Sequence, residues 1–171
     1  MMTTLTQWCS RLATHIATAG MFLLFALFIY GIAMRHLLGM PQTWVDEAVT
    51  LLAAWLVFWT AAFVLSFSEY ISFDVIYRLF SPTAQRIVVM VGALLFIAVF
   101  AASIYGIIDY ILFMNISTTD MLLIPLDQVY AIFAVFLIAM ILRLLILFLR
   151  LAFGEWRQAL IDLEAIPQEH S

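Results

Sequence analysis

Asp46 and Glu47 are the adjacent side chains best suited to chemistry, because a carboxylate inside a membrane can bind a proton or a cation. The stretch that follows, Ala48 to Phe67, carries no charge and is long enough, at about twenty residues, to cross a bilayer as a helix. The pair therefore belongs to the first turn of that helix, at a membrane face, where the helix dipole stabilises carboxylates. This position favours a structural or assembly role over proton or cation coupling.

Basic and aromatic residues surround the acidic pair. Arg35 precedes it across a short turn and can pair with one of the two carboxylates. Trp44 stands at the membrane interface, where tryptophan is expected. Trp55 and Trp59 are four residues apart and share one helix face, on which packing or lipid contact is favoured over substrate stacking. We therefore expect partner contact or interfacial anchoring from six residues: Arg35, Trp44, Asp46, Glu47, Trp55 and Asp74.

Three arginines recur near the C-terminus at intervals of seven residues, which keeps them near one helix face: Arg143, Arg150 and Arg157. Arginine can extend its apolar stem along a membrane helix and keep its charge at the surface. The pattern predicts binding to anionic lipid headgroups, and a partner subunit is the alternative.

Earlier in the chain, small residues recur every four positions, at Ala98, Ala102 and Gly106. Small side chains at this spacing let two membrane helices approach closely. We expect this stripe to pack against another helix, either within the chain or in a partner, although alanine is also a good helix former.

The composition indicates the kind of protein in which these residues are placed. The 171 residues are 67% hydrophobic and 11% charged, with a mean hydropathy of +1.14, a net charge of −4 and arginine for every basic residue except histidine. So few charges cannot coat a soluble domain, which predicts an integral membrane protein and disfavours a nucleic-acid partner. Cys9 is alone and cannot form an intrachain disulfide. The uncharged run that follows Arg11 and extends to Met34 is too long for a signal-peptide core and favours an uncleaved anchor.

The apolar runs predict an all-α protein with one membrane domain over residues 1–171. Four membrane-spanning helices are expected, at about 12–34, 44–67, 87–108 and 128–149. The segment 68–81 is too polar to span and too apolar for water, which favours an interfacial amphipathic helix. Residues 150–171 form the tail. Six arginines fall on the side of the termini and only Arg35 on the other, so the positive-inside rule predicts both termini in the cytoplasm.

Several chemistries lack their motifs in this sequence. There is no glycine-rich phosphate loop and no cysteine or histidine spacing for a metal. His15 and His36 stand at opposite ends of the first span, which does not suit a haem between helices. No span has a glycine or proline break or a charge in its middle, as transporters with their own substrate site usually do. We therefore expect neither an enzyme nor a cofactor, but a helical scaffold.

The stretch from Arg35 to Asp74 resembles the small permease (DctQ-like) subunit of tripartite ATP-independent periplasmic (TRAP) transporters. In that family an arginine ends the first span and is followed by a proline, a tryptophan, a glutamate and a second tryptophan, which here look like Arg35, Pro41, Trp44, Glu47 and Trp55. A small-residue cluster and a histidine-containing element follow in the family. This chain has threonine for the glycine in Thr60-Ala61-Ala62 and tyrosine for the histidine in Tyr70-Ile71-Ser72-Phe73-Asp74.

The resemblance implies a multi-pass subunit of the bacterial cytoplasmic (inner) membrane that pairs with a large permease subunit. The large subunit is implied to hold the substrate and sodium sites and to move its transport domain against the scaffold. A periplasmic binding protein is implied to deliver an organic acid or related solute, and ion gradients to drive its uptake.

Two other functions remain open from the sequence. One is a self-sufficient four-span exporter that couples to protons through Glu47 or Asp46. The other is a membrane anchor for a redox enzyme, which requires a bound haem or flavin.

Overall fold

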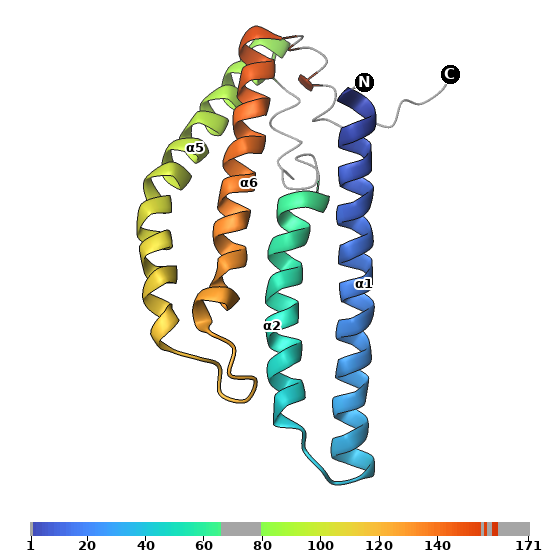
Figure 1. The fold of residues 1–171 in the computed structure, drawn as a ribbon. Coiled ribbons are helices and arrows are strands. Elements are labelled where there is room, and N and C mark those ends of the chain that lie inside the picture. Colours follow the sequence, from blue (N-terminus) through green and yellow to red (C-terminus); the bar gives the residue numbers. More distant parts are fainter. Residues whose placement is uncertain (1, 66–79, 155, 157–158, 161–171) are drawn as a thin grey trace, which may run out of the picture. The chain divides into compact units, whose positions relative to one another are not determined.

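The structure is a computed structural model of the chain (Figure 1). It describes residues 2–65, 80–154, 156 and 159–160. Over these residues the chain is helical and contains no strand. The elements are α1 (Met2–Leu37), α2 (Thr43–Trp59), the π-helix η1 (Thr60–Val64), α5 (Pro82–Phe113), the 3-10 helix η2 (Met114–Ile116) and α6 (Leu126–Phe153).

The helix ends follow local sequence signals. Gly39 has a φ of +64°, a conformation that glycine adopts without strain, and the Met40 amide donates to the Met34 carbonyl 3.1 Å away. These two features end α1 and turn the chain toward α2. Pro82 is the first residue of α5, where its missing N–H costs nothing because that donor has no partner inside the helix.

In the described part of the chain, four helices are long and apolar enough to cross a membrane, the number that the sequence predicted. They cover Ser10–Leu37, Thr43–Val64, Thr83–Ile116 and Leu126–Phe153. The third is longer than the predicted 87–108 because Asp109 ends the uncharged run without ending the helix. In the predicted interfacial segment, residues 68–79 lie outside the described part, as does most of the tail. The orientation of the termini stays a prediction.

The contacts divide the chain into two compact units. The first unit comprises Met1–Val64 and Tyr105–Leu137. In it, α1 and α2 lie side by side and antiparallel, joined by the turn at 38–42 (Figure 1). A Cβ on Gly20 would lie 2.5 Å from Leu56 Cδ2, and one on Gly31 would lie 3.2 Å from Val45 Cγ1. A side chain at either glycine would therefore have to displace Leu56 or Val45 of α2, so glycine suits the close contact of the two helices.

The second unit comprises Leu65–Ile104 and Ile138–Ser171. Its core contains two leucines of α6, Leu147 and Leu151, together with Ala159 and Leu160 from beyond the end of that helix. Val89 and Met90 of α5 and the side chain of Trp156 pack against this cluster. Ala159 and Leu160 therefore lie against the last two turns of α6.

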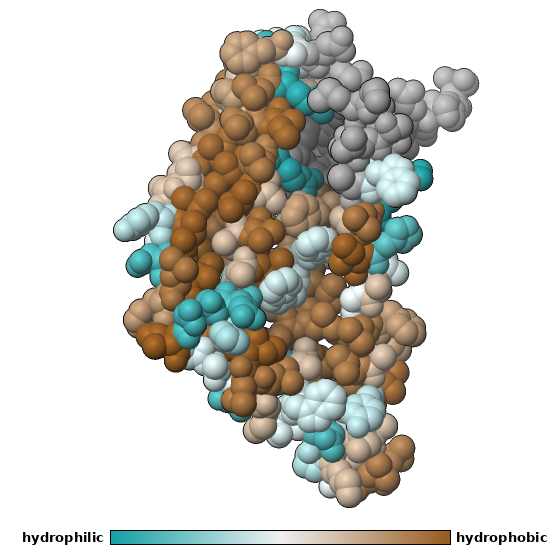
Figure 2. Space-filling model, in the orientation of Figure 1, coloured by the Kyte–Doolittle hydropathy of each residue, from teal (hydrophilic) through white to brown (hydrophobic). Residues whose placement is uncertain are grey.

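Most large apolar side chains of the described helices are exposed to the surroundings. Figure 2 shows hydrophobic residues, in brown, over most of the helix surface on the visible face, with polar residues in smaller groups. Such a surface suits a bilayer, since its lipid tails are as apolar as the side chains.

Candidate functional site

The two acidic residues at the start of α2 have different partners in the first unit. Asp46 accepts a hydrogen bond from the Arg35 guanidinium at 2.5 Å and forms an ion pair with it. The Arg35 and Asp46 side chains are 52% and 59% exposed, and such exposed pairs contribute only about 0–1 kcal/mol to stability. The pair therefore joins the last turn of α1 to the first turn of α2 without strongly stabilising the fold.

Glu47 binds the loop between η2 and α6, which we call the α5–α6 loop (residues 117–125). Glu47 Oε2 accepts the Met121 amide at 2.7 Å, and Oε1 accepts the Leu122 amide at 3.0 Å. The side chain of Thr119, which is buried, also hydrogen-bonds to Glu47. Hydrogen bonds from backbone amides to a carboxylate are among the stronger ones. Both carboxylate oxygens of Glu47 are thus occupied by the chain itself.

The tryptophans of α2 also have polar partners in the first unit. Trp44 Nε1 donates to Gln42 Oε1 at 2.9 Å, and the Trp44 ring centroid is 6.3 Å from that of Tyr30 on α1. Trp55 Nε1 donates to the Val129 carbonyl of α6 at 3.1 Å, and Trp59 Nε1 donates to the Ala13 carbonyl of α1 at 3.1 Å. Trp55 and Trp59 therefore tie α2 to its two neighbours rather than standing free to stack on a solute.

Two arginines of the second unit donate to main-chain carbonyls. Arg143 Nη2 donates to the Leu65 carbonyl at 2.5 Å. Arg86 Nε donates to the Leu151 carbonyl at 2.9 Å and its Nη2 to the Ala152 carbonyl at 3.2 Å, at the C-terminal end of α6. The Arg86 guanidinium also lies 5.5 Å from the centre of the Trp156 ring. A cation at a helix C-terminus satisfies carbonyls that have no helical partner and opposes the negative end of the dipole.

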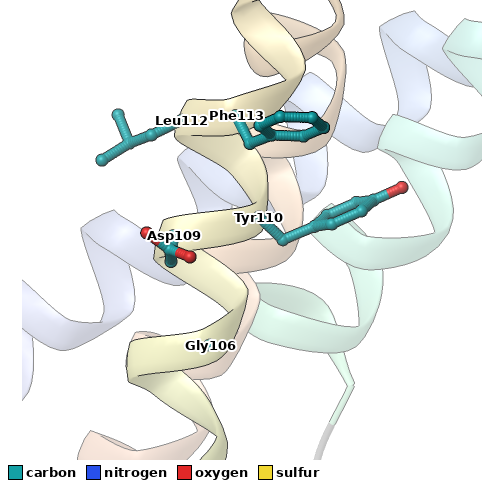
Figure 3. Close-up of a pocket in the computed structure, with 5 residues that line it drawn as sticks. All are labelled: Gly106, Asp109, Tyr110, Leu112 and Phe113. Carbon is teal, nitrogen blue, oxygen red and sulfur yellow. The ribbon is translucent and has the colours of Figure 1, made fainter.

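The small-residue stripe of α5 does not pack inside the described chain. Ala98, Ala102 and Gly106 are exposed, and a Cβ on Gly106 would meet nothing within 4 Å. A shallow depression beside the stripe is lined only by α5 residues, among them Asp109 and Tyr110, which point to opposite sides of the helix (Figure 3). A depression without an opposing wall cannot enclose a ligand.

The structure does not describe all the residues singled out in the sequence. Asp74, Arg157 and the Tyr70–Asp74 element lie outside the described residues, whereas Arg150 is described and exposed. Arg86 and the loop residues that bind Glu47 were not singled out in the sequence. Their partners stand 65 to 75 positions away in the chain, so no local pattern could identify them. Gly20 and Gly31, small residues in an apolar span, were the available signal for the α1–α2 contact.

Comparisons with known proteins identify the family. The model of the family described as "Tripartite ATP-independent periplasmic transporters, DctQ component" matches residues 24–154, which include Arg35, Trp44, Glu47 and Trp55. No curated protein and no solved structure matched the chain. The matched range begins inside α1 and extends through the other three long helices to Gly154. The chain therefore belongs to the DctQ component family, the small permease component of TRAP transporters.

Proposed function

We propose that this chain is a scaffold subunit for the large permease subunit of a TRAP transporter in a bacterial inner membrane. The large subunit carries the sodium and substrate sites, and a periplasmic binding protein delivers an organic acid or related solute to it. The ion gradient drives uptake. This subunit holds no cofactor, catalyses no reaction and supplies apolar helix surface on which the large subunit is assembled.

The observation that carries this proposal is the family match over residues 24–154. The partners of three ionisable side chains in the described helices support the proposal. Asp46 pairs with Arg35, Glu47 binds loop amides, and Arg86 binds the end of α6. These groups hold the chain's own elements together, as expected of a scaffold.

The exporter alternative requires a carboxylate that binds and releases protons during transport. Glu47 is the better candidate of the two acids because it connects α2 to a distant loop, whereas Asp46 is paired with Arg35. Both of its oxygens accept backbone amides, however, and protonation would weaken those bonds and disturb the loop. The arrangement therefore favours a permanent structural carboxylate over a coupling site.

Purification of the tagged chain from its native membrane in a mild detergent tests the proposal. We expect a large multi-spanning membrane protein to accompany it at a constant ratio. A sample in which the detergent has separated a known membrane complex serves as the negative control. Recovery of the chain alone, under conditions that preserve a known complex, contradicts the scaffold role.

A further inference from the structure

The α5–α6 loop satisfies most of its backbone donors with protein groups. Residues 117–125 include one proline and so carry eight N–H groups, and five of these donate: Ser117, Thr119, Met121, Leu122 and Ile124. Their acceptors are the carbonyls of Met114 and Ile124, the carboxylate of Glu47 and the hydroxyl of Thr119. Leu126, the first residue of α6, donates to the Ser117 carbonyl of the loop. A loop in water does not need protein acceptors for its N–H groups, because water accepts these hydrogen bonds. A loop in contact with lipid does need protein acceptors.

Apolar side chains point outward from this loop. Met121 is 54% exposed and Leu123 68%, and Ile116, immediately before the loop, is 76% exposed. Ser117, Thr118 and Asp120 are exposed as well, so the loop presents both polar and apolar side chains. Leu123 has a φ of 53°, a conformation that leucine rarely adopts. The bonds of the neighbouring amides, Leu122 to Glu47 and Ile124 to Thr119, hold Leu123 in this position.

The position of Glu47 gives the level of the loop relative to the bilayer. Glu47 stands three residues after Trp44, about 4.5 Å along the α2 axis, and helical side chains tilt back toward the N-terminus. The Glu47 carboxylate therefore lies near the level of Trp44 and of the Tyr30 ring beside it. Tryptophan and tyrosine mark the headgroup level of a membrane, and the Met121 and Leu122 amides lie within 3.0 Å of that carboxylate.

We infer that the α5–α6 loop is a lipid-binding element, held by Glu47 at the headgroup level, whose Met121 and Leu123 side chains enter the glycerol and upper acyl region of the bilayer. We expect the Asp120 carboxylate, which is exposed on the same loop, to stay in water. This inference requires only that the helices cross a membrane, and it holds whether or not the chain serves as a scaffold.

Lipid fits this surface better than water or a second protein. Apolar side chains gain from leaving water, and the headgroup boundary accepts both the polar and the apolar residues of an amphipathic segment. The exposed apolar surface also continues along the chain into the last turn of α5, at Leu112 and Phe113, which belongs to a candidate span. A protein partner is not needed to satisfy the loop backbone, because Glu47 and the loop's own groups already do so.

Collision measurements on spin labels test the inference in the intact assembly. Cys9→Ser gives a background without cysteine, in which Met121→Cys, Leu123→Cys and Asp120→Cys each receive a nitroxide. The chain is purified with its associated membrane proteins and reconstituted in bilayers of phosphatidylethanolamine and phosphatidylglycerol. Oxygen, which concentrates among acyl chains, and a water-soluble nickel chelate are then applied in separate samples as relaxing agents. Asp120→Cys is the matched control because it lies on the same loop.

We expect the ratio of oxygen to nickel collision rates to be several-fold higher at positions 121 and 123 than at position 120. Nickel that reaches all three labels equally would place the loop in water and overturn the inference. Exclusion of both reagents from positions 121 and 123 would also overturn it, because a protein partner would then cover the loop.

Discussion

At the scale of single residues, Asp46 and Glu47 show that neighbours of the same charge can have different structural roles. The pairing of an acid with Arg35 was predictable, because the two residues flank one short turn. The partners of Glu47 were not predictable, since Met121 and Leu122 of the α5–α6 loop lie more than seventy residues farther along the chain. Sequence periodicity placed Glu47 at a helix start but contained no information on which distant loop would meet it.

Removal of the Glu47 carboxylate is expected to release the loop. In Glu47→Ala, hydrogen exchange at the Met121 and Leu122 amides should accelerate by about tenfold or more, because each loses a charge-assisted acceptor. Exchange mass spectrometry on a peptide that covers residues 117–125 measures this rate. Asp46→Asn is the control: it removes the adjacent charge, whose partner is Arg35, and should leave exchange in the loop unchanged. Equal loop exchange in the wild type and Glu47→Ala would refute the role of Glu47.

At the scale of the elements, arginine side chains connect helices to main-chain carbonyls that are distant in the sequence. Arg86 at the start of α5 binds the end of α6, and Arg143 binds the carbonyl of Leu65, which follows η1. The arginines at 143, 150 and 157 were predicted to bind lipid headgroups on the strength of their spacing alone. The Arg143 contact shows that an arginine within a membrane helix can instead donate to a main-chain carbonyl of a distant segment, which the spacing of the arginines does not reveal.

The contact between α1 and α2 yields an element-scale prediction. Gly20→Leu should destabilise the chain by about 1–3 kcal/mol, because the new side chain overlaps Leu56. Leu56→Ala should recover part of this loss, with a coupling of about 0.5–3 kcal/mol in a double-mutant cycle. Unfolding in mixed micelles measures these free energies.

Gly92→Leu is the matched control, since a Cβ at Gly92 meets nothing within 4 Å in the described chain. It should change stability far less than Gly20→Leu does. A Gly20→Leu variant as stable as Gly92→Leu, or a cycle without coupling, would show that α1 and α2 do not pack through Gly20.

At the scale of the whole molecule, composition and apolar runs were enough to predict four membrane helices, because a bilayer imposes length and hydrophobicity directly on the sequence. The family was also predictable, from Arg35, Trp44, Glu47 and Trp55 in order, and the family match confirms it. The helix that contains the third predicted span extends beyond 87–108 at both ends, because a charged residue does not by itself end a helix. The helix faces that meet the large subunit could not be predicted, since an apolar span has the same composition whether its face contacts lipid or another helix.

The central claim, that this chain supports transport without performing it, is tested most directly by flux into proteoliposomes. The chain is reconstituted alone, and in parallel with its large permease subunit and the soluble binding protein, under the same ion gradients. We expect no solute or proton flux from the chain alone and ion-driven uptake only from the complete system. Proton-coupled flux by the chain alone that disappears in Glu47→Gln would contradict the account and favour the exporter.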